Sequence, residues 1–225
     1  MKLNILLTLT AAAGLLLSSC EYDNFNAPES MLTGRVVYDG KAISVRNNGP
    51  QLELWQDGFA LKSKIDVFLR QDGTFSAQLF DGQYKLVRRG DSPWLQQAAD
   101  TIIVNVKGET SIDVPVTPYF NFTSDSYQKT GNTITAQFVV NKVVPTANVE
   151  LVRLYLGKSV LIDQVQREFR QDGNVGSLIF GQTTTISGVI PDDLKNLDYI
   201  YARLGIKATA SSEYVYTQVQ KIALK

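Results

Sequence analysis

The side chains that could do chemistry in this chain of 225 residues are carboxylates, one thiol and aromatic rings, because the sequence contains no histidine and a single cysteine, Cys20. Without histidine the chain lacks the commonest general base and metal ligand. Neither a Ser-His nor a Cys-His nucleophile pair can form. Zinc sites are built from clusters of cysteine and histidine, and these are missing too.

The carboxylates form no recognisable acid–base pair. Glycoside hydrolysis requires two carboxyl groups roughly 5–10 Å apart in a cleft. Several aspartates stand instead in Asp-Gly pairs, where the side chain serves a turn: Asp39, Asp57, Asp72 and Asp81. The only adjacent acidic pair, Asp192-Asp193, follows Pro191 and is typical of the first turn of a short helix. We therefore predict no catalytic residues, no metal and no cofactor.

Two tryptophans are candidates for ligand binding. In the alternating segment 51–56, Leu52 and Leu54 take the core face, so Trp55 lies on the opposite face with Glu53. A tryptophan on a polar face requires a ligand, the other domain or a covering loop. Trp94 lies in the irregular segment 90–99, and loop aromatics are better binding candidates than strand aromatics. It could equally close the end of a sandwich.

A third candidate is a surface of tyrosines and arginines on three predicted strands. If Ile200, Ala202 and Leu204 face the core, alternation turns their neighbours outward. The same argument applies to the segments around residues 152–156 and 214–216. The side chains predicted to share this outer face are Tyr199, Tyr201, Arg203, Tyr214, Tyr216, Arg153 and Tyr155. Two explanations fit: cross-strand pairing of the rings, or a platform for a glycan or a protein partner.

The elements that position these residues are strands. From Met31 onward the apolar residues recur with period two, and Asp-Gly turns separate the runs at hairpin spacing. The pattern predicts an all-β protein of two tandem β-sandwich domains, residues 31–116 and 117–225. Val114-Pro-Val-Thr-Pro-Tyr119 lies between them, and we predict a stiff proline hinge there.

Each predicted domain resembles a known sandwich. Gly34-Arg-Val-Val-Tyr-Asp-Gly40, followed by an Asp-Gly-x-Phe hairpin at 72–75 and Gly82-Gln-Tyr84, resembles the transthyretin-like or carboxypeptidase-regulatory domain. The closing hairpin, residues 199–208 and 213–222, resembles the last strands of a fibronectin type III or immunoglobulin-like domain. A single cysteine excludes the intersheet disulfide of antibody domains.

The start of the chain is typical of an exported lipoprotein. Lys2 and an apolar run of about fifteen residues form a signal peptide, predicted over residues 1–19. Leu17-Ser-Ser-Cys20 resembles the bacterial lipobox, which implies cleavage before Cys20 and its acylation. Residues 20–30 are then a polar tether. Glu21 and Asp23 resemble a surface-export signal of Bacteroidetes lipoproteins. The alternative is an ordinary signal peptide with an incidental cysteine.

The whole layout resembles a family of two-domain Bacteroidetes surface lipoproteins associated with outer-membrane glycan uptake. The resemblance rests on the lipobox, Gly90-Asp-Ser-Pro-Trp94, the Pro-Val-Thr-Pro-Tyr119 connection and the two sandwich patterns. It implies a lipid-anchored, non-catalytic protein at the outer membrane that assists polysaccharide capture or an uptake complex. Lys and Arg number 22, as do Asp and Glu, so we expect no nucleic-acid partner. The alternative is an adhesive module that contacts proteins only.

Overall fold

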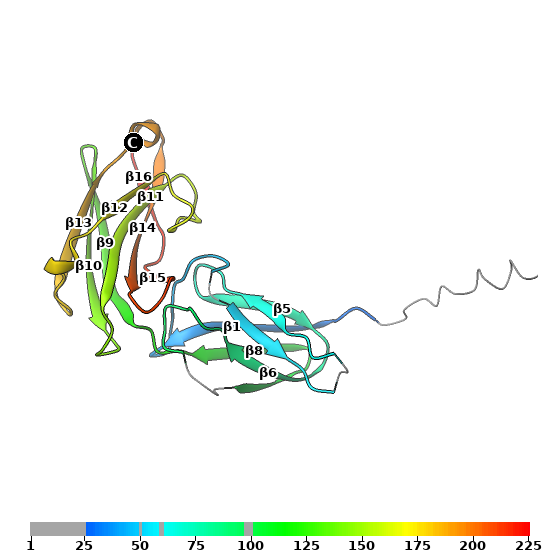
Figure 1. Cartoon of the computed structure of the whole chain (residues 1–225). Coiled ribbons are helices and arrows are strands. Elements are labelled where there is room, and N and C mark those ends of the chain that lie inside the picture. The colour runs from blue at the N-terminus through cyan, green and yellow to red at the C-terminus, as the bar shows by residue number, and fades with distance from the viewer. Residues whose placement is uncertain (1–25, 50, 59–60, 97–100) are drawn as a thin grey trace, which may run out of the picture.

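The computed structural model describes residues 26–49, 51–58, 61–96 and 101–225. Two domains built almost entirely of strands follow one another along the chain (Figure 1). This arrangement confirms the prediction of an all-β protein with two tandem β-sandwiches. The predicted signal peptide, Cys20, Glu21 and Asp23 lie outside the described residues.

The N-terminal domain packs two sheets face to face. Its strands are β1 (Ser30–Tyr38), β2 (Lys41–Ala42), β3 (Gln51–Trp55), β4 (Ile65–Phe68), β5 (Thr74–Leu79), β6 (Gly82–Arg88), β7 (Ile102–Val106) and β8 (Glu109–Pro115). In one sheet β1 pairs antiparallel with β2 and β5 and parallel with β8. The other sheet has the order β4-β3-β6-β7.

The C-terminal domain is a second sandwich. Its elements are β9 (Phe120–Thr130), β10 (Thr133–Lys142), β11 (Val149–Gly157), β12 (Phe169–Asp172), η1 (Val175–Ser177), β13 (Thr183–Val189), α2 (Asp192–Lys195), β14 (Tyr199–Ala208), β15 (Tyr214–Tyr216) and β16 (Gln220–Ala223). One sheet has the order β13-β10-β9. The other has the order β12-β11-β14-β15, and β16 also pairs with β14. The short helix predicted at Asp192-Asp193 is α2.

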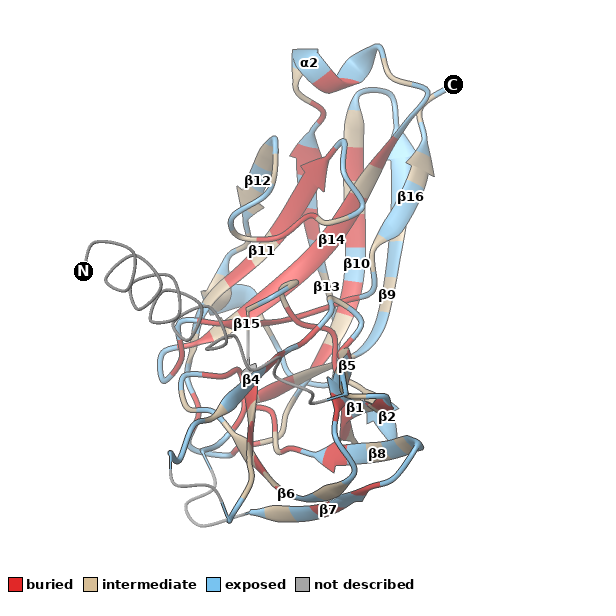
Figure 2. Ribbon diagram, turned by 90° about the vertical axis from the view of Figure 1, so that its right-hand side faces the viewer, coloured by how far each residue is buried: buried red, intermediate tan, exposed pale blue. Residues whose placement is uncertain are grey.

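Alternating burial along the strands explains why the chain folds this way. The inward residues of β10, such as Ile134, Ala136 and Phe138, are fully buried, whereas the residues between them are not. Figure 2 shows that β11 and β14 are mainly buried along their length. The apolar side chains of both domains form one connected cluster, so the hydrophobic core continues from one domain into the other.

One Asp-Gly turn shows why glycine is required. Gly73, between β4 and β5, has φ +82°, and a Cβ atom there would lie 2.2 Å from the carbonyl oxygen of Ile43. The turn therefore approaches the backbone of the segment after β2, and Val36 N–H donates to the Gly73 carbonyl at 2.9 Å. Only glycine combines this conformation with this closeness.

The connection between the domains is packed and hydrogen-bonded. Thr117 accepts a hydrogen bond from Leu95 N–H at 2.9 Å, and Tyr119 N–H donates to Pro93 at 3.2 Å. Val116, between the two prolines, is buried. The prediction of a hinge is therefore wrong, because the loop that contains Trp94 pairs with this segment and fixes it.

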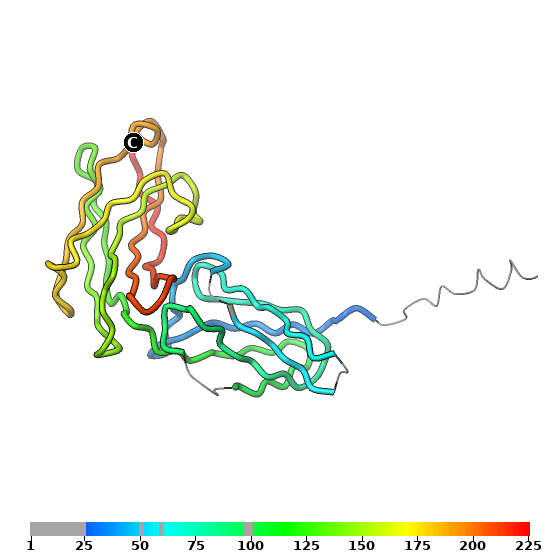
Figure 3. The backbone as a smooth tube through the Cα atoms, viewed as in Figure 1, coloured from blue at the N-terminus to red at the C-terminus, as the bar shows by residue number. Residues whose placement is uncertain are grey.

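The chain runs from one end of the molecule to the other. The first described residues lie at the end of the N-terminal domain that is farthest from the C-terminal domain (Figure 3). The C-terminus lies at the far end of the C-terminal domain. The two domains meet at an angle, with β15 close to the N-terminal domain (Figure 1).

Candidate functional site

The predicted tyrosine–arginine side chains share one sheet face, but most of this face is covered. Tyr155 on β11 lies opposite Arg203 on β14. Tyr155, Arg203, Tyr214 and Tyr216 are each no more than 2% exposed. The prediction that these four side chains face solvent is wrong, and they cannot form an open platform.

Two segments cover this face. The chain between β11 and β12 folds back over the rings, so that Ile162 is buried among them and Gln164 N–H donates to the Tyr216 hydroxyl at 3.1 Å. The N-terminal domain covers the other side, where Tyr216 N–H donates to the Ser44 carbonyl at 2.9 Å. Burial raises the pKa of both Tyr155 and Tyr216, so these hydroxyls remain neutral.

Arg203 is the centre of the domain junction. Its guanidinium donates to backbone carbonyls of both domains: Thr217 at 2.9 Å, Ile162 at 3.3 Å, Val45 at 2.9 Å and Gln71 at 3.0 Å. It also stacks 4.2 Å from the centroid of the Tyr216 ring. Burial lowers the pKa of Arg203 to about 10, because the guanidinium is removed from water. It still carries its charge at neutral pH.

Ion pairs surround this centre. Arg46 of the N-terminal domain binds Glu213 through two hydrogen bonds, Nη2 to Oε1 at 2.5 Å and Nε to Oε2 at 3.2 Å. Arg153, predicted to face outward, is mostly buried: it donates to Asp172 at 2.7 Å and to the Tyr214 hydroxyl at 2.8 Å. Arg153 is thus a structural group within the C-terminal domain.

The two tryptophans are placed differently. Trp94 is 2% exposed and forms an isolated bridge with Pro118, so it closes the domain junction and presents no ring to a ligand. Its prediction as a loop-borne ligand contact is therefore wrong. Trp55 is half-buried on the outer face of β3, as its register predicts, and its indole N–H donates to Glu53 at 3.2 Å.

Tyr199 and Tyr201 form the exposed end of the same sheet face. Tyr199 is 40% exposed, Tyr201 is half-buried, and their rings meet edge to face at 5.7 Å. Lys221 on β16 holds its ammonium 3.6 Å from the centroid of the Tyr199 ring. Of the predicted tyrosines, these two remain open to a ligand.

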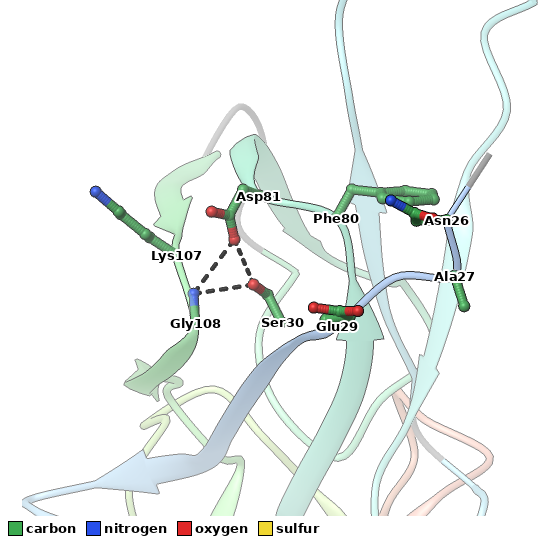
Figure 4. Close-up of a pocket in the computed structure, with 8 residues that line it drawn as sticks. All are labelled: Asn26, Ala27, Glu29, Ser30, Phe80, Asp81, Lys107 and Gly108. Carbon is green, nitrogen blue, oxygen red and sulfur yellow. Dashed lines mark hydrogen bonds between the residues drawn. The ribbon is translucent and has the colours of Figure 1, made fainter. Parts of the chain in front are cut away.

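A hollow of about 590 Å³ lies where the chain enters the N-terminal domain (Figure 4). Figure 4 shows that Ser30, Asp81 and Gly108 bind one another there: Ser30 donates to Asp81, and Gly108 N–H donates to Ser30 at 2.9 Å. The serine bond lowers the pKa of Asp81. These polar groups fasten the start of β1, which is a structural function.

A second hollow, of about 410 Å³, has a different character. We call it the junction groove: Tyr38, Asn121, Asn141, Lys142, Val143, Phe180 and Gly181. Phe180 is 38% exposed and stacks in parallel on the buried ring of Phe120, with 5.8 Å between centroids. Asn121 and Asn141 occupy paired positions on β9 and β10.

The junction groove offers the groups that bind sugars. A partly exposed ring can pack against the apolar face of a pyranose, and amide side chains both donate to and accept from hydroxyls. Lys142 lies 5.6 Å from the Phe180 ring centroid and adds a further donor. Tyr38 belongs to β1, so the groove is built by both domains.

Sequence reasoning missed these groove residues. Phe180 follows η1 in an irregular segment, and the residues that meet it come from β1, β9 and β10. No motif joins positions so far apart along the chain. The one local signal was the aromatic Phe180 outside a periodic run, the same signal that drew attention to Trp94.

The described residues contain no group of three or more His, Cys, Asp or Glu side chains close enough to share a metal ion. Within the same part of the chain, no helix has the length and apolar character needed to cross a membrane.

The two sandwiches and their packed junction define a class of two-domain all-β proteins, and comparison places the chain within it. Residues 30–117 match the N-terminal domain of a protein of unknown function, DUF3823, and residues 120–221 match the DUF3823 C-terminal domain. The chain belongs to the DUF3823 family. No curated protein matches it.

Solved structures of similar proteins come from Bacteroides and Parabacteroides species. A DUF3823 family protein from Bacteroides ovatus is 47% identical, with a TM-score of 0.83; the match covers 87% of this chain and 100% of that one. A DUF3823 family protein from Parabacteroides merdae is 37% identical, with a TM-score of 0.81 and coverage of 88% and 100%. A "putative carbohydrate binding protein" from Bacteroides uniformis shares the fold at 18% identity, with a TM-score of 0.73 and coverage of 88% and 100%. These matches indicate no catalytic family.

Proposed function

We propose that this protein is a non-catalytic surface lipoprotein that binds polysaccharide at the junction groove. The observation that carries the proposal is the groove itself, where a partly exposed phenylalanine ring lies beside two amides and an ammonium group. The carbohydrate binding named for the Bacteroides uniformis protein of the same fold supports this proposal.

Binding at such a groove is weak and requires no chemistry. The groove is shallow and open, so only part of a ligand loses its water, and we expect dissociation constants in the micromolar to millimolar range. We expect no bond of the glycan to be made or broken, because the sequence offers no recognisable pair of catalytic carboxylates.

The location follows from Cys20. Acylation of its thiol and of the new amino group would give more than one acyl chain, which suffices for stable anchoring in the outer membrane. Cys20→Ala is expected to move the protein from the membrane fraction to the soluble fraction. Recovery of this variant with membranes would contradict the anchor and leave the glycan site untouched.

The glycan site is tested by calorimetric titration of the mature chain, residues 20–225, against a panel of polysaccharides. Phe180→Ala is expected to weaken binding about twofold to tenfold, since a stacked ring contributes roughly 0.5–1.5 kcal/mol. Phe80→Ala is the matched control, because Phe80 is 50% exposed but lies in the hollow at the other end of the N-terminal domain. An equal loss of affinity in both variants, or no measurable binding to any polysaccharide of the panel, would contradict the proposal. No binding to polysaccharides combined with capture of an uptake-complex protein would favour the adhesive alternative.

A further inference from the structure

The junction groove is the first of three hollows that follow one edge of the C-terminal sandwich. The next, of about 130 Å³, shares Asn121 with the groove; we call it the Asp125 pocket, and segments 42–44 and 215–218 form its other walls. The third, of about 370 Å³, shares Asp125 with that pocket and ends at Lys221, between β9 and β16. Because each neighbouring pair of hollows shares a lining residue, the three hollows are adjacent along β9.

β9 is an edge strand, because among the described strands it pairs in a ladder with β10 alone. From Asn121 to Tyr127 the strand spans about 20 Å at the rise of an extended chain. Single pockets for compact ligands have volumes of roughly 300–1,000 Å³. The Asp125 pocket is smaller than this, so the series suits a long, narrow ligand better than a compact one.

Asp125 has an acceptor that no protein group satisfies. Its Oδ2 atom is buried and has no hydrogen-bond partner among the described residues. Neighbouring polar groups bind one another instead: Gln218 donates to Ser44 at 2.6 Å, and the Tyr127 and Thr217 hydroxyls are 2.8 Å apart. Asp125 lines two of the hollows, so a ligand that enters them meets its carboxylate, and the hydroxyls of a sugar are donors that a carboxylate accepts.

Asp125 is also held in an unfavourable environment. Burial raises the pKa of the Asp125 carboxyl, and the neighbouring Tyr127 hydroxyl offsets only part of this rise. A carboxyl group with a raised pKa destabilises the folded state when it is ionised at neutral pH. Side chains that cost stability are typical of binding sites.

A ring and an ammonium group occur near both ends of the series of hollows. Phe180 and Lys142 line the hollow at the domain junction, whereas Lys221 lines the third hollow and its ammonium contacts the ring of Tyr199 on the neighbouring strand β14. Both rings are partly exposed. The same pairing of a flat ring with a donor, on either side of a carboxylate, suits a repeated ligand.

We propose that the ligand is an extended neutral polysaccharide chain that lies along β9 from Phe180 to Lys221, with Asp125 accepting its hydroxyls at the middle. This inference rests on the proposed glycan binding and adds the form of the ligand. It assigns binding to a stretch of chain rather than to a chain end or a single sugar.

The test is a chain-length series, from disaccharide to octasaccharide, of whichever glycan the panel identifies, titrated against the mature chain. Affinity is expected to rise at least tenfold along the series. Asp125→Asn should weaken binding of every length at least tenfold. Lys221→Ala should weaken only the longer oligosaccharides, about threefold to tenfold. Asp192→Asn, at a carboxylate whose side chain is 95% exposed, and Lys129→Ala, further along β9, are matched controls that should change nothing.

Stability measurements separate binding from folding. Asp125→Asn is expected to raise the midpoint of unfolding at pH 7 while it removes binding, a pair of effects that a purely structural residue would not show. Constant affinity from disaccharide to octasaccharide would overturn the extended ligand and leave the junction groove as a glycan site. No binding at any length would overturn both proposals. If no glycan binds but an extended peptide binds, and Asp125→Asn removes that binding, the polysaccharide proposal is overturned. The result would favour a protein partner that adds a strand to the sheet.

Discussion

The two ends of β14 carry the same kinds of side chain on the same sheet face, yet only one end meets solvent. At the far end Tyr199 is 40% exposed, whereas at the junction Arg203 is 1% exposed and is covered by Tyr216. The difference comes from what lies above each end, namely the segment between β11 and β12 and the N-terminal domain. Alternation along a strand therefore decides the face of a residue but not its exposure.

The largest effect is expected at the junction end from Arg203→Met. The substitution removes a donor from four backbone carbonyls of both domains, of which the Gln71 carbonyl keeps its bond from Val45 N–H at 3.1 Å. We expect the free energy of unfolding to fall by about 3–5 kcal/mol. Each buried acceptor left unpaired costs about 1–3 kcal/mol, and water molecules can donate hydrogen bonds to some of these carbonyls in the variant. Denaturant titration measures the loss, and solution scattering reports whether the angle between the domains becomes variable.

The control is Arg170→Met on exposed β12, whose free energy of unfolding is expected to lie within about 0.5 kcal/mol of the wild-type value. A comparable loss in both variants would remove the distinction between buried and exposed arginines.

A smaller effect is expected from Gly205→Ala, also on β14. A Cβ atom there would lie 2.9 Å from the Tyr216 ring and 3.1 Å from the Tyr155 ring. Because the rings are buried and cannot move freely, we expect a loss of about 1–3 kcal/mol in the free energy of unfolding. A changed near-ultraviolet circular dichroism signal should accompany the loss. Gly90→Ala, where the nearest atom is 3.5 Å away, serves as the control. An unchanged stability and spectrum would mean that the covered end is loosely packed.

At the exposed end Tyr199→Ala should cost little. The lysine–ring contact contributes about 0.5–1 kcal/mol at an exposed site, and the edge-to-face contact with Tyr201 adds a similar amount, so we expect a stability loss of about 1–2 kcal/mol. Denaturant titration of Tyr199→Ala beside Tyr216→Ala compares the two ends directly. A loss as large as that of Tyr216→Ala would show that both ends are structural.

The smallest effect concerns acid stability at the junction. Ser212 donates to Asp91 across the domains through its hydroxyl at 2.5 Å and its N–H at 2.8 Å, and these bonds lower the pKa of Asp91. A lowered carboxyl pKa adds stability above the ordinary value, near 4, and this stability is lost as the pH falls through the lowered value. Unfolding measured from pH 7 to pH 2 should therefore show a slightly shallower acid decline for Asp91→Asn than for the wild type. Identical declines would show that this bond contributes nothing.

Local pattern was enough to predict the architecture. Period-two runs and Asp-Gly turns predict strands wherever one face is buried, and the helical turn at Asp192 follows from local chemistry. The predicted outer face of Tyr155, Arg203 and Tyr216 is also correct in register.

The cover over that face could not be predicted, because it depends on tertiary contacts. Ile162 has no local reason to lie on the tyrosine rings, and the backbone carbonyls bound by Arg203 belong to segments far apart in the chain. The junction groove could not be predicted for the same reason, because Phe180 and Tyr38 line one groove only once both domains are folded. The predicted hinge was wrong for this reason too, because Trp94 reaches Pro118 from another loop.

The parallel pairing of β1 with β8 has a mechanical consequence. A force between the tether and the C-terminal domain is applied to the first residue of β1 and to the last residue of β8, which lie at opposite ends of the pair. The strands are then loaded in shear, and the pairs from Met31↔Glu109 to Val37↔Pro115 resist together instead of opening one after another. A protein connected in this way can be pulled from both ends without its first domain unravelling from the N-terminal side.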